Sequence, residues 1–140
     1  MKKIILIGRT GSGKTTLMQA INNLSKEYKK TQAIEYFDSV LDTPGEYIEN
    51  KRYYNALIVS SYDCDVIGLV HDCTDEECIF PPNFAFIFAK PVIGIITKID
   101  CANRNIHWSE NCLKRAGAGN IFEISAMNGT GLNELKVFLA

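Results

Sequence analysis

The sequence predicts a three-layer α/β fold, in which a mostly parallel, doubly wound sheet of about six strands is flanked by helices. Three short runs of the chain, residues 4–7, 66–70 and 92–96, are almost wholly apolar. Such runs are typical of parallel strands that helices cover on both faces, because neither side of the strand then meets water. After the first run and a glycine-rich stretch, apolar residues recur at helical spacing at Leu17, Ala20, Ile21 and Leu24.

The other elements follow from patterning and from chain breakers. Further strands are expected at residues 33–37, 39–41 and 121–124, the first two forming a tight hairpin around Asp38. Helices are expected at residues 14–24, 52–61, 83–89, 109–115 and 132–139, and Gly117 and Gly119 end the fourth of them.

The expected helix at residues 83–89 is short and almost wholly apolar. Two prolines break the chain before Asn83, which can cap this helix. The segment is either a core helix against the sheet or a docking patch for a partner, with Phe84 and Phe88 on one face and Phe86 pointing elsewhere.

Length and charge limit the classes of protein to which the chain can belong. Its 140 residues suit one domain, residues 1–140, without a repeat or linker. A net charge of −1 gives no basic excess that would favour nucleic acid or an anionic membrane as a partner. The apolar run after Lys3 has four residues, too few for a signal peptide or a membrane span, so a soluble, cytoplasmic protein is expected.

Five cysteines are present, at positions 64, 73, 78, 101 and 112. Their odd number and the absence of a C-x-x-C pair argue against a disulfide framework and against a zinc site. Cys73 and Cys78 with His71 form a conceivable metal cluster, but free thiols in and beside a strand end are the simpler interpretation. Free thiols fit a reducing compartment.

Residues 8–15 form a complete G-x-x-x-x-G-K-[ST] phosphate-binding loop between the first strand and the first helix. Its glycines allow backbone N–H groups to close around phosphate oxygens, and the positive end of the helix dipole favours the anion. Lys14 is expected to reach the β- and γ-phosphates, and the Thr15 hydroxyl to hold Mg²⁺. The sequence therefore predicts triphosphate binding through Gly8, Thr10, Gly11, Ser12, Gly13, Lys14, Thr15 and Thr16.

Asp42, Thr43, Pro44 and Gly45 follow the expected strand at residues 39–41 and form a D-x-x-G motif. A carboxylate at this strand end is suited to hold Mg²⁺, through water in most such sites, and the Gly45 N–H is suited to sense a γ-phosphate. By itself the motif is weak evidence for a nucleotide site, because it matches many turns. It is stronger evidence here because it follows a phosphate-binding loop.

Two further motifs point to recognition of a base. Thr97, Lys98 and Asp100 follow the strand at residues 92–96, where ligands of doubly wound sheets bind. The Asp100 carboxylate can accept two hydrogen bonds from N1–H and the 2-amino group of guanine, a donor pair that adenine lacks. Ser125 and Ala126 follow the last strand, and their backbone N–H groups can contact the O6 acceptor of the base.

In chain order, these four motifs resemble those of small GTPase-like P-loop NTPases, and the resemblance covers nearly the whole chain. Residues 30–36, the short span to residues 42–47, and residues 52–58 are more closely similar to the ethanolamine/propanediol-utilisation family. That family implies a truncated small-GTPase-like fold, Mg²⁺, GTP or GDP (or ATP), and a role beside bacterial microcompartments that degrade small alcohols and amines. Shell association and phosphoryl transfer to acetate are also attached to the family.

Carried over by position, Thr31 resembles the switch threonine that completes the Mg²⁺ shell, although a solvated threonine after a lysine-rich turn is the alternative. The motifs and this carry-over together make Thr15, Thr31 and Asp42 the candidate metal ligands, and Lys14, Thr31, Gly45 and Glu46 the candidate catalytic residues.

Glu46 departs from the small-GTPase pattern, which places a glutamine after D-x-x-G to orient the attacking water. An ionised glutamate can only accept hydrogen bonds, and its charge repels phosphates. Slow intrinsic hydrolysis is therefore expected. Arg9 is either a stabiliser of transition-state charge in cis or, more simply, a solvated arginine.

Three functions remain open at this point. The first is a slow GTPase that acts as a molecular switch, read by a microcompartment shell or enzyme partner. The second is a small-molecule phosphotransferase, such as an acetate kinase using ATP or GTP. The third is a nucleotide-dependent adaptor on a compartment shell, for which residues 84–88 or 52–58 are candidate docking surfaces.

Overall fold

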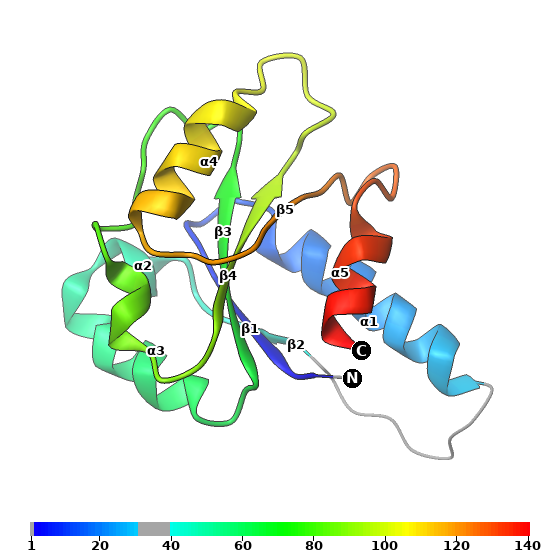
Figure 1. Ribbon diagram of the computed structural model, residues 1–140, viewed down its shortest axis with the longest axis horizontal. Helices are drawn as coiled ribbons and strands as arrows, with labels where there is room; N and C mark the ends of the chain where they lie inside the picture. Colours follow the sequence, from blue (N-terminus) through cyan, green and yellow to red (C-terminus); the bar gives the residue numbers. More distant parts are fainter. Residues whose placement is uncertain (1, 31–39) are drawn as a thin grey trace.

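Five parallel strands form one sheet within residues 2–30 and 40–140, which the computed structural model describes without the side chains of residues 23–30 (Figure 1). In spatial order the strands are β2 (Val40–Asp42), β1 (Ile4–Ile7), β3 (Val66–Asp72), β4 (Val92–Thr97) and β5 (Ile121–Glu123). Helices cover both faces of the sheet. The predicted three-layer α/β fold is thus confirmed, and the strand expected at residues 33–37, with its hairpin, lies outside the described residues.

The order of the strands creates a crevice for ligands. The chain passes from β1 outward to β2 and then crosses back to β3 on the other side of β1. Because all pairings are parallel, the carboxyl ends of the strands share one edge. In open α/β sheets the point where strand order reverses, here between β1 and β3, is where ligands bind.

Two hydrophobic clusters fix the helices to the two faces. Ile4 and Leu6 of β1 belong to the cluster beneath α1 (Lys14–Lys30) and α5 (Leu132–Leu139), which lie side by side (Figure 1). Ile5 and Ile7 belong to the opposite cluster, because successive side chains of a strand point to opposite faces.

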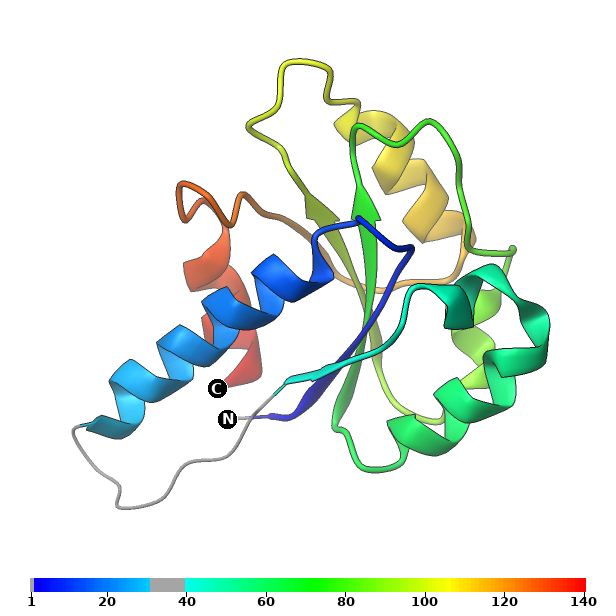
Figure 2. The same ribbon diagram turned by 180° about the vertical axis from the view of Figure 1, so that it is seen from behind.

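The second face carries α3 (Tyr54–Ser61) and α4 (Ile106–Arg115), seen from behind in Figure 2. The short elements α2 (Glu46–Glu49) and η1 (Lys51–Tyr53) lead into α3, and η2 (Phe84–Ile87) precedes β4. Most boundaries agree with the sequence prediction to within a few residues. α1 continues six residues beyond the expected end, and α4 begins three residues early because the Asn105 side chain accepts a hydrogen bond from the Trp108 N–H.

The helix expected at residues 83–89 is wrong in kind, since only the single 3₁₀ turn η2 forms there. Asn83 has a left-handed backbone with φ of 63°, and Phe88 is extended, so a helix propagates in neither direction. The expected division of side chains is confirmed: Phe84 and Phe88 are buried with their ring centroids 5.5 Å apart, whereas Phe86 is 75% exposed.

The expectation of free thiols throughout is also wrong. Cys78, between β3 and η2, forms a disulfide with Cys112 of α4, their Cα atoms being 5.8 Å apart. The two lie 34 positions apart in sequence, so only the packing of α4 against this face brings them together. Cys64, Cys73 and Cys101 are free thiols. Among the described residues, no group of three or more histidine, cysteine, aspartate or glutamate side chains is placed to hold a metal ion.

Within the described part of the chain, no helix is both long and apolar enough to cross a membrane.

The packing of α4 on β4 gives a first prediction. A Cβ atom at Gly94 would lie 2.9 Å from Leu113 Cδ1 and 3.2 Å from Leu113 Cβ. We expect Gly94→Ala to lower the free energy of unfolding by about 1–3 kcal/mol through overpacking. Gly119→Ala is the matched control, because its Cβ would meet only the Val92 carbonyl at an ordinary 3.4 Å. Urea denaturation measures both, and equal stabilities of the two variants would contradict this account.

Candidate functional site

The residues singled out from the sequence gather at the carboxyl edge of the sheet. Residues 8–15 follow β1, Asp42 ends β2, Thr97 ends β4, and Ser125 lies two residues beyond β5. Thr31 lies outside the described residues. The shared edge brings together segments that are more than 80 positions apart in sequence, which the following contacts show in detail.

The loop of residues 8–15 wraps around the amino group of its own lysine. Lys14 Nζ donates to the backbone oxygens of Gly8 at 2.7 Å and Arg9 at 3.1 Å, and Lys14 is 6% exposed. Gly11 and Gly13 have φ of 82° and 96°, a conformation that favours glycine. Burial lowers the pKa of Lys14, an effect that Asp42 and Glu49 oppose. A phosphate group beside this ammonium would likewise favour its charged form.

Asp42 and Thr15 lie together at the start of α1. Thr15 Oγ1 donates to Asp42 Oδ2 at 3.1 Å. The other carboxylate oxygen, Asp42 Oδ1, is buried and finds no hydrogen-bond partner among the described residues. An unpartnered carboxylate oxygen beside a hydroxyl is a fitting donor set for Mg²⁺, which prefers hard oxygen ligands and keeps several waters.

Gly45 packs directly on the phosphate loop. A Cβ atom at this position would collide with the backbone nitrogen and the hydroxyl of Thr10. Glycine is therefore required for the D-x-x-G segment to approach the loop this closely. Glu46 begins α2 immediately afterwards, and its side chain is exposed.

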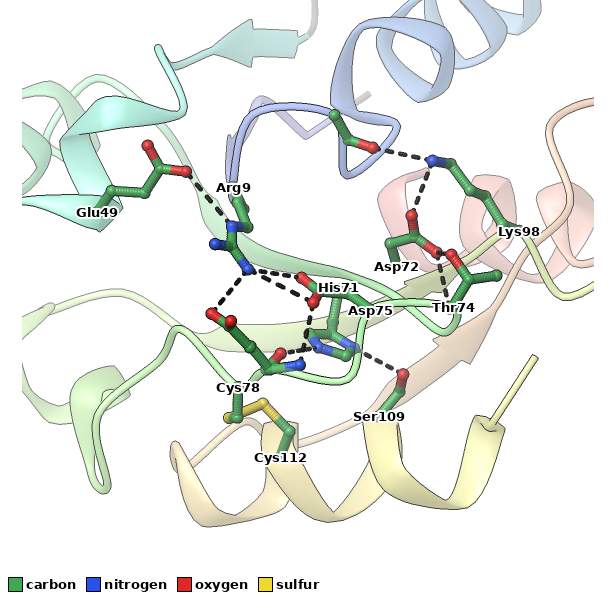
Figure 3. A network of polar contacts seen from close by, with 12 residues as sticks. Arg9, Glu49, His71, Asp72, Thr74, Asp75, Cys78, Lys98, Ser109 and Cys112 are labelled. Carbon is green, nitrogen blue, oxygen red and sulfur yellow. Dashed lines mark hydrogen bonds and ion pairs between the residues drawn. A yellow bond between two sulfur atoms is a disulfide. The ribbon is translucent and has the colours of Figure 1, made fainter. Parts of the chain in front are cut away.

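The segment after β4 is tied to the phosphate loop by two side chains. Thr97 Oγ1 donates to the Ser12 carbonyl at 2.6 Å, and Lys98 Nζ donates to the Gly11 carbonyl at 2.9 Å. Lys98 Nζ also pairs with Asp72 Oδ2 at 2.8 Å (Figure 3). These bonds fix the segment after β4 relative to residues 8–15.

Asp100 is oriented by the loop after β5. Ser125 Oγ donates to Asp100 Oδ1 at 2.9 Å, which holds the carboxylate at the rim of a pocket. The pocket has a volume of about 270 Å³ and is lined by Gly13, Thr16, Thr97, Lys98, Asp100, Cys101, Ala126 and Met127. It thus joins the helix end of the phosphate loop to both predicted base-binding segments.

Asp72, at the end of β3, was not singled out from the sequence. Burial would raise the pKa of this carboxyl group, but hydrogen bonds from Lys98 and Thr74 outweigh that effect and hold its pKa below the usual range. The available signal was its position at the end of an apolar run, beyond the boundary expected for that strand.

Arg9 also has partners that the sequence did not indicate. Its guanidinium forms ion pairs with Asp75 at 3.3 Å, Glu77 at 3.1 Å and Glu49 at 3.5 Å. In Figure 3 it points from the phosphate loop toward Glu49 and Asp75. Arg9 is therefore not the freely solvated arginine that was the simpler of the two expectations.

His71 and Ser109 form a pair that resembles a base and a nucleophile but is buried. His71 Nδ1 lies 2.6 Å from Ser109 Oγ, and His71 Nε2 lies 2.9 Å from the Glu77 carbonyl (Figure 3). Since a carbonyl only accepts, His71 Nε2 donates to Glu77, and His71 Nδ1 shares a hydrogen bond with Ser109 Oγ. The residues are 2% and 0% exposed, so the pair lies in the interior of the fold and joins β3 to α4.

Comparisons with known proteins give the family context. A family model described as ethanolamine utilisation – propanediol utilisation matches residues 1–140. The "Propanediol utilization protein PduV" of Citrobacter freundii is 41% identical over 140 residues, covering 99% of this chain and 93% of that protein. Proteins named "Probable acetate kinase EutP" from Escherichia coli K12 and Salmonella typhimurium LT2 are each 34% identical over 143 residues, covering 100% of this chain and 90% of theirs.

The pair of Lys98 and Asp72 gives a second prediction. A carboxyl group whose pKa is lowered by folding stabilises the fold above its unfolded pKa, near 3.9, and this contribution is lost as pH falls through the lowered value. In Lys98→Met only the hydrogen bonds from Thr74 remain to oppose the effect of burial, so we expect the pKa of Asp72 to rise and acid unfolding to begin at a higher pH. Carbon-13 NMR titration of the Asp72 carboxyl group measures this.

Lys114→Met is the control for this prediction. It removes an exposed lysine whose partner is Glu110 at 2.7 Å on the same helix. The Asp72 titration should be unchanged in this variant. If Lys98→Met also left it unchanged, the hydrogen bond from Lys98 would not be what lowers the pKa.

Proposed function

The chain belongs to the ethanolamine-utilisation and propanediol-utilisation family, and from this premise we propose that it is a Mg²⁺-dependent guanine-nucleotide-binding protein that hydrolyses GTP slowly. We further propose that it acts as a molecular switch, in the cytoplasm and in association with bacterial microcompartments. Its partner in this role is a shell component or an enzyme of the compartment.

The observation that carries the proposal is the orientation of Asp100 at the pocket beside the phosphate loop. Ser125 holds one of its oxygens, and Lys98 lines the same pocket while bonded to Gly11. A fixed carboxylate suits the paired N1–H and 2-amino donors of guanine, and the stem of Lys98 can lie along a base plane. Adenine presents no such pair of donors.

In the proposed reaction, the phosphate loop holds the β- and γ-phosphates, and Lys14 neutralises charge that develops between them. Mg²⁺ would supply further charge neutralisation, with Thr15 and Asp42 suited to hold it and Thr31 assigned by resemblance. The Gly45 N–H is suited to the γ-phosphate. Glu46 can accept a proton or hydrogen bond from water but donates nothing to the phosphate, which is why we propose a slow rate.

Phosphoryl transfer to a small carboxylate is a second candidate, because three relatives carry the printed name "Probable acetate kinase EutP". A kinase needs room for an acceptor beside the γ-phosphate. A cavity of about 240 Å³ lies against the phosphate loop, lined in part by Arg9, Thr10 and Asp72. In this reaction a carboxylate oxygen would attack the γ-phosphorus and the nucleoside diphosphate would leave.

Substitution of Asp100 tests base recognition. We expect Asp100→Asn to weaken GTP and GDP binding by roughly 10- to 100-fold, the equivalent of one or two charge-assisted hydrogen bonds, and to leave ATP binding unchanged. Calorimetric titration with Mg²⁺ measures all three nucleotides. The control is Asp63→Asn, the same chemical change at an exposed position before β3, on the opposite edge of the sheet.

ATP binding that equals or exceeds GTP binding in the wild-type protein, and that Asp100→Asn does not alter, would refute guanine recognition. Assays of phosphate transfer to acetate would then decide for the second candidate. Acetyl phosphate formed in proportion to the diphosphate released would establish it.

The role of Glu46 is tested by hydrolysis kinetics. Glu46→Gln restores a side chain that both donates and accepts, so we expect a severalfold faster release of phosphate from GTP. Glu134→Gln, on the exposed side of α5, is the control and should leave the rate unchanged. An unchanged rate in Glu46→Gln would show that Glu46 does not limit hydrolysis.

A further inference from the structure

The side chain of Arg9 joins three parts of the molecule that the sequence separates. Its guanidinium pairs with Glu49 on α2 and with Asp75 and Glu77 in the segment after β3. Arg9 itself belongs to the phosphate loop. The ion pairs leave its side chain 34% exposed, and in Figure 3 Glu49 and Asp75 approach the guanidinium from different sides.

The backbone of Arg9 connects these ion pairs to the candidate phosphate site. Its carbonyl oxygen accepts from the Ser12 N–H at 3.0 Å and from Lys14 Nζ at 3.1 Å. A displacement of Arg9 therefore shifts an acceptor that holds the phosphate-binding lysine. No other side chain of residues 8–15 forms an ion pair in the described part of the structure.

The segment that carries Asp75 and Glu77 is anchored on the sheet and on α4. The Asp75 N–H donates to the Asp72 carbonyl at 2.9 Å, and the Glu77 carbonyl accepts from buried His71 at 2.9 Å. The next residue, Cys78, is linked to Cys112 of α4 by the disulfide. Asp75 and Glu77, which pair with Arg9, are thus held in place by bonds to the sheet and to α4.

The other side reaches an element that begins at the D-x-x-G motif. Glu49 ends α2, which starts directly after Gly45, and Gly45 packs against Thr10 of the phosphate loop. A γ-phosphate bound at Lys14 and Gly45 would contact both the phosphate loop and the start of α2. The ion pair of Arg9 with Glu49 joins the same loop to the end of α2.

The charge of this cluster predicts how loss of Arg9 changes the affinity for a triphosphate relative to a diphosphate. Three carboxylates surround one guanidinium, so this cluster carries a formal charge of −2 beside the candidate phosphate site. Removing the arginine charge makes the cluster more negative, and a triphosphate, which carries more negative charge than a diphosphate, is repelled more strongly.

We propose that Arg9 is a positioning residue that couples the phosphate loop to α2 and sets the preference for a nucleoside triphosphate over the diphosphate. It acts through the Lys14 acceptor and the Glu49 ion pair, and it does not itself touch the phosphates. This inference rests on the proposed nucleotide-binding function and adds to it the residue that discriminates the γ-phosphate.

The test is the ratio of triphosphate to diphosphate affinity in Arg9→Gln, measured by calorimetry with Mg²⁺. We expect the ratio of GTP to GDP affinity to fall about 5- to 10-fold, with GDP affinity changed less than twofold. Arg115→Gln is the matched control, the same change at an exposed position at the end of α4, and should leave the ratio unchanged. Equal losses for both nucleotides, or an unchanged ratio, would overturn the proposal.

A double-mutant cycle tests whether the coupling between the phosphate loop and α2 depends on the ion pair of Arg9 with Glu49. If it does, Arg9→Gln should lower the ratio of GTP to GDP affinity less in a Glu49→Gln background than in the wild-type background. If the effects of the two substitutions on this ratio were additive, the coupling would not pass through the ion pair. Glu77→Gln keeps the arginine and serves as the second variant if Arg9→Gln does not fold. It makes the cluster less negative, so a smaller rise of the ratio is expected, and an unchanged ratio would overturn the proposal.

The same measurements separate this inference from the proposed function. If the wild-type protein prefers adenine nucleotides, guanine recognition fails, but the ratio of ATP to ADP affinity tests Arg9 in the same way. A wild-type protein that binds neither triphosphate more tightly than its diphosphate would overturn the role of Arg9.

Discussion

The candidate site depends on one constraint, the parallel direction of all the strands in the described sheet. Parallel pairing places the carboxyl ends of β1, β2, β3 and β4 along one edge, and each of these ends carries a polar group of the site. The reversal of strand order between β1 and β3 then opens the crevice at that edge. The apolar clusters on both faces hold the helices, and through them the loops, in place.

Within this frame, Lys98 links the two halves of the site. It has a left-handed backbone with φ of 62°, unusual for lysine, and its amino group bridges Asp72 and the Gly11 carbonyl. Hydrogen bonds to charged groups stabilise a fold more when they are shielded from water than when they are exposed, as is the pair of Lys114 with Glu110. The polar contacts that matter most are therefore those that tie loops together across the crevice.

Hydrolysis and phosphoryl transfer would use the same arrangement of Lys14, Thr15 and Asp42. They differ only in the molecule that attacks the γ-phosphorus, water in one case and a carboxylate in the other. The acidic surroundings, with Glu46, Glu49 and Asp75 near the phosphate loop, disfavour an anionic acceptor unless positive charge offsets them. The ion pairs of Arg9 provide part of that offset, which links the further inference to the choice between the two reactions.

The sequence by itself determined the strand–loop–helix unit, the order of the motifs and most element boundaries, because these depend on local patterns of apolar residues and glycines. It also singled out Lys14, Asp42, Gly45, Lys98 and Asp100, which the structure places at one edge of the sheet and whose roles are predictions from motif context. Only the tertiary structure decided the disulfide of Cys78 with Cys112, the pair of His71 with Ser109 and the three partners of Arg9. These pairs lie 34 or more positions apart, and whether they meet is set by how α2 and α4 pack against the sheet, which local pattern does not encode.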